Sequence, residues 1–325
     1  MHMQFSLLRY LGFLGLLAIA WCNSAIAQNF PSRPITLIVS SAPAGPLDAA
    51  GRMLADYLSK SLGKPVVIEN RPGASGAVAA GILAKAPADG YTLMISTRAI
   101  TINPSLYKLP FDTSKAFVPV AMVMGQPNLL VVGKDFPART VPQLIQVLKD
   151  NPEKYTFGSP GSGGIPHLAG EMFKSFTGTS ILHIPYKGAA PLMTDLLGGR
   201  VDMTFSSPGT ALAQVNEGKV FPIAIASDKR SPLLPNIPTF AEYGIKGFNI
   251  ESWYGVFAPS GTPLDVVKLL NQEINAFLRT EDAKKRISNL GATPVILSPE
   301  EFKILFDDDL SRFSKLVRQL SIGVD

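Results

Sequence analysis

The chain has 325 residues, of which 46% are hydrophobic and 17% charged, with 28 glycines and 27 prolines. This composition excludes a disordered, collagen-like or coiled-coil chain, and the length is typical of about two domains. The formal charge of +5 comes from 30 basic and 25 acidic residues without a basic block, so nucleic acid is a poor partner. One cysteine and three histidines exclude a disulfide framework and leave little basis for a metal site, and no cofactor is expected.

The N-terminus has the pattern of an export signal. Arg9 precedes an apolar run of about ten residues, and an Ala-Ile-Ala sequence at 25–27 provides a cleavage site. We therefore predict residues 1–27 as a signal peptide cleaved after Ala27, which places the mature chain in the periplasm. The alternative is a lipoprotein signal through Cys22, but a tryptophan precedes that cysteine where a small residue is needed.

Short β-like runs alternate with amphipathic helical runs along the rest of the chain, which indicates an α/β fold. The predicted strands are 35–40, 66–69, 91–97, two pieces within 117–132, 155–158, 181–186, 202–205, 223–227 and 250–258. The predicted helices follow residue 47, span 76–85, 141–149, 165–176 and 190–197, and begin near Pro263, Glu281 and Pro299. We expect two lobes, one formed by 28–126 with 250–325 and the other by 127–249, with two crossings between them.

Two strand–loop–helix junctions are the main candidate binding elements, because ligands of such sheets bind at the carboxyl ends of strands. Both junctions place small residues before a helix N-terminus, where free N–H groups and the helix dipole favour an anion such as a carboxylate. The alternative is an ordinary βα loop that needs small residues for tight packing. The candidates are Ala42, Ala44, Gly45, Leu47 and Asp48 in the first junction, and Ser159, Gly161, Ser162, Gly163 and His167 in the second.

Further candidates follow other strands. Thr97 and Arg98 end the third predicted strand, and Tyr186 and Lys187 follow the strand that contains His183. The Arg98 guanidinium could hold an acidic group in fork geometry or stack on an aromatic ring, whereas the alternative is a solvated surface arginine. His167 and His183 are each either ligand contacts or buried histidines with satisfied hydrogen bonds.

Enzyme motifs are largely absent. There is no nucleophile elbow, phosphate-binding loop, dinucleotide fingerprint or zinc-protease motif. Ser162, His167 and Asp202 could be combined into a hydrolytic triad, but two of them are only five residues apart across a loop and a helix start, which is poor geometry. A serine hydrolase is therefore a remote alternative, with Asp202 kept as a candidate site residue.

Many short segments in order resemble one family. The sequence is similar to the substrate-binding receptors of tripartite tricarboxylate transporters, the Bug or TctC family, over essentially the whole mature chain. The segments that carry the resemblance are 31–35, 42–48, 69–74, 86–93, 102–107, 158–170, 183–191, 195–199, 201–203, 230–232, 235–239 and 258–263.

The resemblance implies a type II-like two-lobe periplasmic binding protein, with helices on both faces of each sheet and a cleft that closes on a ligand. It further implies a monomeric receptor without catalysis, which holds a small organic carboxylate at the two junctions, partly through ordered water, and delivers it to the membrane components of a transporter. A sensor of the same fold is the alternative. Where the family usually has glycine and threonine, this chain has Ala44 and Leu47. We expect Leu47 to make the ligand's surroundings apolar and Arg98 to contact a second acidic group or an aromatic ring.

Overall fold

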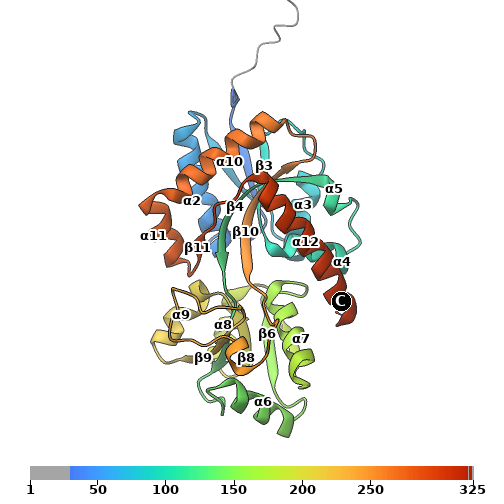
Figure 1. The fold of residues 1–325 in the computed structure, drawn as a ribbon, viewed down its shortest axis with the longest axis vertical. Helices are drawn as coiled ribbons and strands as arrows, with labels where there is room; N and C mark the ends of the chain where they lie inside the picture. The colour runs from blue at the N-terminus through green and yellow to red at the C-terminus, as the bar shows by residue number, and fades with distance from the viewer. Residues whose placement is uncertain (1–29, 321, 324–325) are drawn as a thin grey trace, which may run out of the picture.

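The computed structural model describes residues 30–320 and 322–323, so the predicted signal peptide lies outside the described residues. The strands form two separate sheets, each in its own lobe, and Figure 1 shows the lobes one above the other. The expected α/β two-lobe architecture is confirmed.

The first lobe contains a six-stranded mixed sheet in the order β11-β4-β10-β3-β1-β2. β1, β2 and β3 are parallel, whereas β10 is antiparallel to both of its neighbours. Its strands are β1 (Ile35–Val39), β2 (Val66–Asn70), β3 (Thr92–Thr97), β4 (Phe117–Gln126), β10 (Ser252–Pro259) and β11 (Thr293–Pro294). Its helices are α2 (Pro46–Ser61), η1 (Ala74–Gly76), α3 (Ala77–Leu83), η2 (Arg98–Thr101), α4 (Asn103–Leu106), α5 (Thr113–Ala116), α10 (Leu264–Arg279), α11 (Glu281–Asn289) and α12 (Pro299–Gln319).

The second lobe contains a five-stranded sheet in the order β7-β6-β8-β5-β9. β6 is parallel to β7 and β8, and β5 is antiparallel to β8 and β9. Its strands are β5 (Leu129–Gly133), β6 (Thr156–Ser159), β7 (Leu182–Pro185), β8 (Met203–Ser206) and β9 (Val220–Ile225). Its helices are α6 (Val141–Asp150), α7 (Ile165–Thr177), α8 (Ala189–Leu197), α9 (Pro208–Asn216) and η3 (Ala241–Tyr243).

Helices cover both faces of the first sheet, which explains why its central strands are nearly continuous apolar runs. Every residue of β10 is buried. Its side chains alternate between two clusters, with Val256 among residues of α2, α10 and α11, and Phe257 among residues of α3 and α12. Each large side chain buried in this way contributes about 1.5–3 kcal/mol.

The chain crosses between the lobes twice. The first crossing is Pro127 and Asn128, between β4 and β5, and the second is the longer segment 226–251 between β9 and β10 (Figure 1). On this basis we propose the lobe boundaries 126/127 and 249/250. Among the described residues, none of the helices combines the length and the apolar character that spanning a membrane requires.

The structure adds several short elements that the sequence did not predict, among them η2, α4, α5, α9, η3 and β11. Pro208-Gly209 at the start of α9 has the composition of a turn, and β11 has only two residues. The predicted strand 223–227 is also displaced, since β9 spans Val220–Ile225.

Candidate functional site

The first junction connects β1 to α2 and is fastened by a buried carboxylate. Asp48 accepts hydrogen bonds from the Ala44 N–H (3.0 Å), the Asn70 amide (2.8 Å) and the Arg52 guanidinium (2.9 Å). Burial raises the pKa of Asp48, but these three donors outweigh burial, so the pKa lies below its usual value. Asp48 is therefore ionised at neutral pH and anchors the loop to its own helix.

Leu47 occupies the core rather than the loop surface. Only 3% of the residue is exposed, and it packs in the same cluster as Ala50 and Leu54. Positions 47, 50 and 54 share one face of α2 because of the helical repeat. The expectation that Leu47 makes the ligand's surroundings apolar was wrong. By contrast, Ala42 and Ala44 are exposed, and Ala44 has a left-handed backbone with φ of +65°.

The second junction connects β6 to α7 and depends on glycine. Gly161 and Gly163 have φ values of +156° and +77°, which side chains disfavour. The Gly163 N–H donates to His167 Nδ1 (3.0 Å), and the Ser159 hydroxyl donates to the Gly161 carbonyl (2.9 Å). These bonds shape the loop around the start of α7.

The two histidines stack on each other beneath this loop. Their ring centroids lie 3.9 Å apart at an interplanar angle of 10°. Burial lowers the pKa of His167, and burial together with His167 lowers the pKa of His183 to about 3, so both rings are neutral at pH 7. His167 is buried and His183 is half-buried, and one nitrogen of each ring has a hydrogen-bond partner within the chain.

Ser159 Oγ lies 2.7 Å from His183 Nε2. Because the Ser159 hydroxyl proton is directed to the Gly161 carbonyl, the network assigns His183 Nε2–H as the donor to Ser159. An activated serine requires the imidazole as the proton acceptor instead. This serine–histidine pair is thus arranged for structure, and the hydroxyl is not poised as a nucleophile.

Asp202 lies near the beginning of the parallel strands β6 and β8, whereas the second junction follows the end of β6. It accepts hydrogen bonds from the Thr156 N–H (2.8 Å) and the Thr156 hydroxyl (2.9 Å) at the beginning of β6, whereas Ser159 is the last residue of that strand. Since β6 and β8 are parallel, residues that begin these strands lie away from the carboxyl-end loops. The prediction of Asp202 as a site residue was wrong, and the triad with Ser162 and His167 is not assembled.

Tyr186 and Lys187 do follow β7 at the carboxyl edge. The Tyr186 N–H donates to the Ser159 carbonyl (2.8 Å), and its hydroxyl donates to Asp195 (3.0 Å). Burial and the neighbouring Asp195 raise the pKa of Tyr186, so it stays protonated. Lys187 is exposed beside it.

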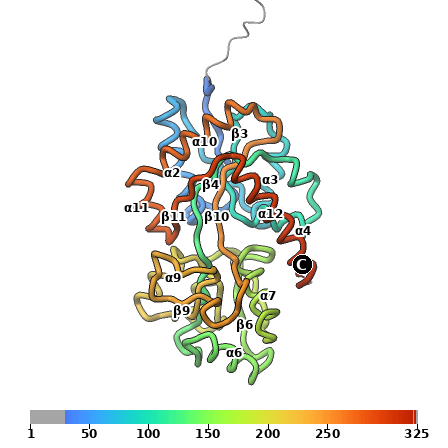
Figure 2. Tube along the Cα trace, in the orientation of Figure 1, coloured from blue at the N-terminus to red at the C-terminus, as the bar shows by residue number. Residues whose placement is uncertain are grey.

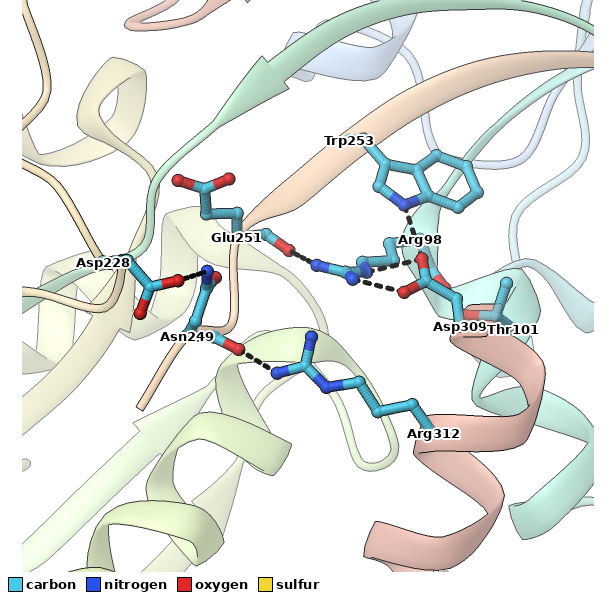
Figure 3. Close-up of polar contacts among 8 residues, drawn as sticks. All are labelled: Arg98, Thr101, Asp228, Asn249, Glu251, Trp253, Asp309 and Arg312. Carbon is cyan, nitrogen blue, oxygen red and sulfur yellow. Dashed lines mark hydrogen bonds and ion pairs between the residues drawn. The ribbon is translucent and has the colours of Figure 1, made fainter. Parts of the chain in front are cut away.

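Arg98 is neither a ligand contact nor a solvated surface residue. Its guanidinium forms a bidentate ion pair with Asp309 of α12 and donates to the Glu251 carbonyl (2.7 Å), and Figure 3 shows this fork geometry. The Trp253 indole N–H also donates to Asp309 (2.8 Å), and both charged residues are at least 94% buried. The expectation of ligand contact was wrong, because the acidic group that Arg98 holds is Asp309 of the same chain and not a group of the ligand. Thr97 caps η2 by accepting from the Ala99 N–H (3.3 Å).

The two lobes touch where Ser162, a predicted site residue, meets two residues that were not predicted as site residues. The Ser75 hydroxyl (3.1 Å) and the Tyr107 hydroxyl (3.3 Å), both in the first lobe, donate to the Ser162 carbonyl of the second junction. The Asn103 amide donates to the Ser75 carbonyl (3.2 Å). The available signals were the turn composition at 70–73 and the family resemblance of segment 102–107, and neither identifies a contact with Ser162, which is 87 residues from Ser75.

The backbone around Ser75 is strained. Four consecutive residues have positive φ values, +132° at Gly73, +45° at Ala74, +50° at Ser75 and +95° at Gly76. A left-handed conformation costs about 1–2 kcal/mol at a residue with a side chain. Gly76 lies against Ser40, since a Cβ on this glycine would be 3.3 Å from the Ser40 side chain. The first junction, η1 and the second junction are therefore contiguous.

The helix N-termini at these junctions lack side-chain caps. α2, α7 and α8 begin after Gly45, Gly164 and Gly188, and none of these residues has a side chain to accept from the first turn. By contrast, α6, α11 and α12 carry Thr140, Thr280 and Ser298 as caps. Uncapped N–H groups with a positive dipole end favour an anion. Within residues 30–320 and 322–323, no three His, Cys, Asp or Glu side chains are grouped so that they could hold a metal ion.

Two α/β lobes with their carboxyl-end loops in contact define the class of two-lobe periplasmic binding proteins. The model of the tripartite tricarboxylate transporter family receptor, TctC, matches residues 50–322, and the chain belongs to this family.

Three similar proteins illustrate the relationship. The UPF0065 protein in the tcbD-tcbE intergenic region of Pseudomonas sp. (strain P51) is 37% identical, over 91% of this chain and 89% of that protein. R. palustris Rpa4515, solved with adipate, is 36% identical with a TM-score of 0.85, over 91% of this chain and 100% of that one. MatC from Rhodopseudomonas palustris, solved with bound malate, is 30% identical with a TM-score of 0.79, over 89% and 100%.

Proposed function

We propose that this chain captures a small organic carboxylate between its two lobes and delivers it to the membrane components of a tripartite transporter. The observation that carries the proposal is the set of glycine-capped helix N-termini at the carboxyl ends of β1, β6 and β7. Their N–H groups offer neutral donors that a carboxylate can accept from, without a charged side chain.

A dicarboxylate is the preferred ligand class. The basis for a second acidic group is no longer Arg98, whose fork is occupied by Asp309. Support comes instead from two relatives solved with adipate and with malate, both of which are dicarboxylates. An aromatic acid remains in the proposal only through the general carboxylate chemistry of the junctions.

The test is isothermal titration calorimetry of the mature chain with adipate, malate and benzoate. Hexane-1,6-diol serves as the matched neutral control, because it keeps the carbon chain of adipate and removes both charges. We expect at least one dicarboxylate to bind and the diol not to bind. Equal affinity for adipate and the diol would contradict anion recognition, and consumption of a bound acid would contradict a receptor without catalysis.

Transport and sensing are separated in cells. We propose that deleting the gene abolishes uptake of the radiolabelled acid and that the mature chain in the periplasm restores it. Unchanged uptake combined with a lost transcriptional response would favour the sensor instead. The intact mass of the periplasmic protein tests cleavage after Ala27, and sedimentation analysis tests the monomer.

A further inference from the structure

A second direct contact between the lobes joins α9 to the end of α11. Figures 1 and 2 both place α9 of the second lobe opposite α11 and β11 of the first. A Cβ on Gly209 would lie 2.8 Å from the Leu290 carbonyl carbon and still closer to its oxygen. A Cβ on Gly291 would lie 2.6 Å from the Gly209 nitrogen. Two glycines thus allow the two backbones to meet without side chains between them.

The local structure does not require glycine at 209. Gly209 is in the first turn of α9, directly after Pro208, and its φ value is not positive. Alanine favours a helix over glycine, so the second lobe by itself would favour alanine at this position. The three atoms nearest to such a side chain all belong to Leu290, which is in the other lobe.

The Ser162 carbonyl provides an independent contact between the lobes. It accepts from the hydroxyls of Ser75 and Tyr107, which a strained turn and α4 place opposite it. Strain of this kind persists where the surrounding structure uses it. Two separate contacts therefore cross the lobe boundary. One consists of hydrogen bonds to Ser162, and in the other the backbones of Gly209 and Leu290 approach each other directly.

We propose that Gly209 is a positioning residue that determines how closely the lobes approach, and that the Ser75 and Tyr107 bonds to Ser162 hold them there before any ligand binds. Ligand affinity then includes the free energy of closure, because only the closed arrangement brings both junctions to one ligand. The ligand part of this inference rests on the proposed function, whereas the closure part does not.

The experiment measures distances between nitroxide labels by pulsed electron resonance. Labels attached to Lys285→Cys on α11 and Ala213→Cys on α9 occupy exposed positions on either side of the contact. The chain's one cysteine is Cys22, in the predicted signal peptide, so the labels are specific. Gly209→Ala is compared with Gly81→Ala, the same change in α3, where the nearest heavy atom to a new Cβ is at an ordinary 3.8 Å.

In the ligand-free parent and in Gly81→Ala we expect a short-distance population that Gly209→Ala loses, although the melting temperature of Gly209→Ala stays equal or rises. Tyr107→Phe should reduce this population and weaken adipate binding about 2- to 10-fold, mainly through faster dissociation. Gly209→Ala should weaken binding at least as much.

A parent without the short-distance population, or a Gly209→Ala variant with parental distances and affinity, would overturn the inference. If adipate and malate bind to no variant while the ligand-free distances differ as expected, the dicarboxylate assignment fails and the closure mechanism stands.

Discussion

At the residue scale, Gly161 has a backbone conformation that favours glycine and also lies in the proposed carboxylate-binding loop. Gly161→Val should abolish or weaken carboxylate binding, because the side chain would enter the loop before α7. Its φ of +156° also makes any side chain strained. Gly178→Val measures that strain separately, since Gly178 has φ of +63° with open space around it. Calorimetry should show lost binding in the first variant alone, and an unchanged dissociation constant in Gly161→Val would contradict the anion site.

His183 predicts a pH dependence of stability. Its pKa of about 3 lies below the unfolded value of about 6.5, so between these values the unfolded chain binds one more proton than the folded chain. This contribution is complete above pH 6.5 and is lost as the pH falls toward 3. Denaturant unfolding of the parent and of His183→Gln should differ by a slope below about 1.4 kcal/mol per pH unit in that window, because the half-buried ring is partly screened by solvent. Identical pH profiles for the two proteins would contradict a half-buried His183 that is neutral in the folded chain.

The sequence predicted loops but not their partners. Glycine and proline near 45 and 161 identify turns before helices, because these residues determine local backbone geometry. Hydrogen-bond partners depend on the tertiary arrangement, and Arg98 and Asp309 are 211 residues apart. From sequence alone, a residue at the end of a strand can be interpreted equally well as a ligand contact or as part of an internal ion pair. Arg98 forms the internal pair.

At the scale of elements, the second crossing is held at three consecutive carbonyls. Arg312 of α12 donates to the carbonyl of Asn249, Asn128 of the first crossing donates to that of Ile250 (2.6 Å), and Arg98 donates to that of Glu251 (2.7 Å). Figure 3 shows Arg98 and Arg312 approaching this segment. α12 thereby positions the segment that joins the lobes.

Arg98→Ala should lower the free energy of unfolding by about 3–5 kcal/mol, because it leaves Asp309 charged, buried and unpaired. Ligand contact by Arg98 would predict a loss of binding, whereas the buried ion pair predicts a loss of stability. The double variant Arg98→Met with Asp309→Leu should recover much of the loss, because it removes both charges. Chemical denaturation checks both variants, and a loss below about 1 kcal/mol in Arg98→Ala would contradict the buried pair.

Strongly periodic elements were predicted well, and short ones were not. α10 and α12 have clear apolar faces with Leu270 and Phe306 fully buried, so the sequence contains the information. α9 contains Ala211 as its only buried side chain beyond Pro208, so its periodic signal is weak. Gly209 is in the first turn of α9. The contact that we propose to limit closure therefore lies in a helix that the apolar periodicity of the sequence did not predict.

At the scale of the whole molecule, the two sheets are joined by two crossings and by a shared apolar cluster, in which Phe313 and Val317 of α12 lie with Phe173 of the second lobe. Neither sheet takes a strand from the other lobe, so a change in the distance between the lobes breaks no strand pairing. Domain motion of this kind is expected where the joining segments absorb the change in angle. Here the shorter crossing is only Pro127 and Asn128, which restricts the motion to a bend about one narrow region.

Small-angle scattering tests this motion without labels. A ligand that contacts both lobes can only favour the arrangement in which both sets of contacts form, so saturating adipate should reduce the radius of gyration of the parent. Because the bonds to Ser162 also favour closure, the ligand-free parent should already be more compact than ligand-free Gly209→Ala. The reduction on adding ligand should therefore be modest in the parent. Equal radii for the ligand-free parent, the ligand-saturated parent and Gly209→Ala would mean that the lobes do not move, and affinity would then depend on the junctions alone.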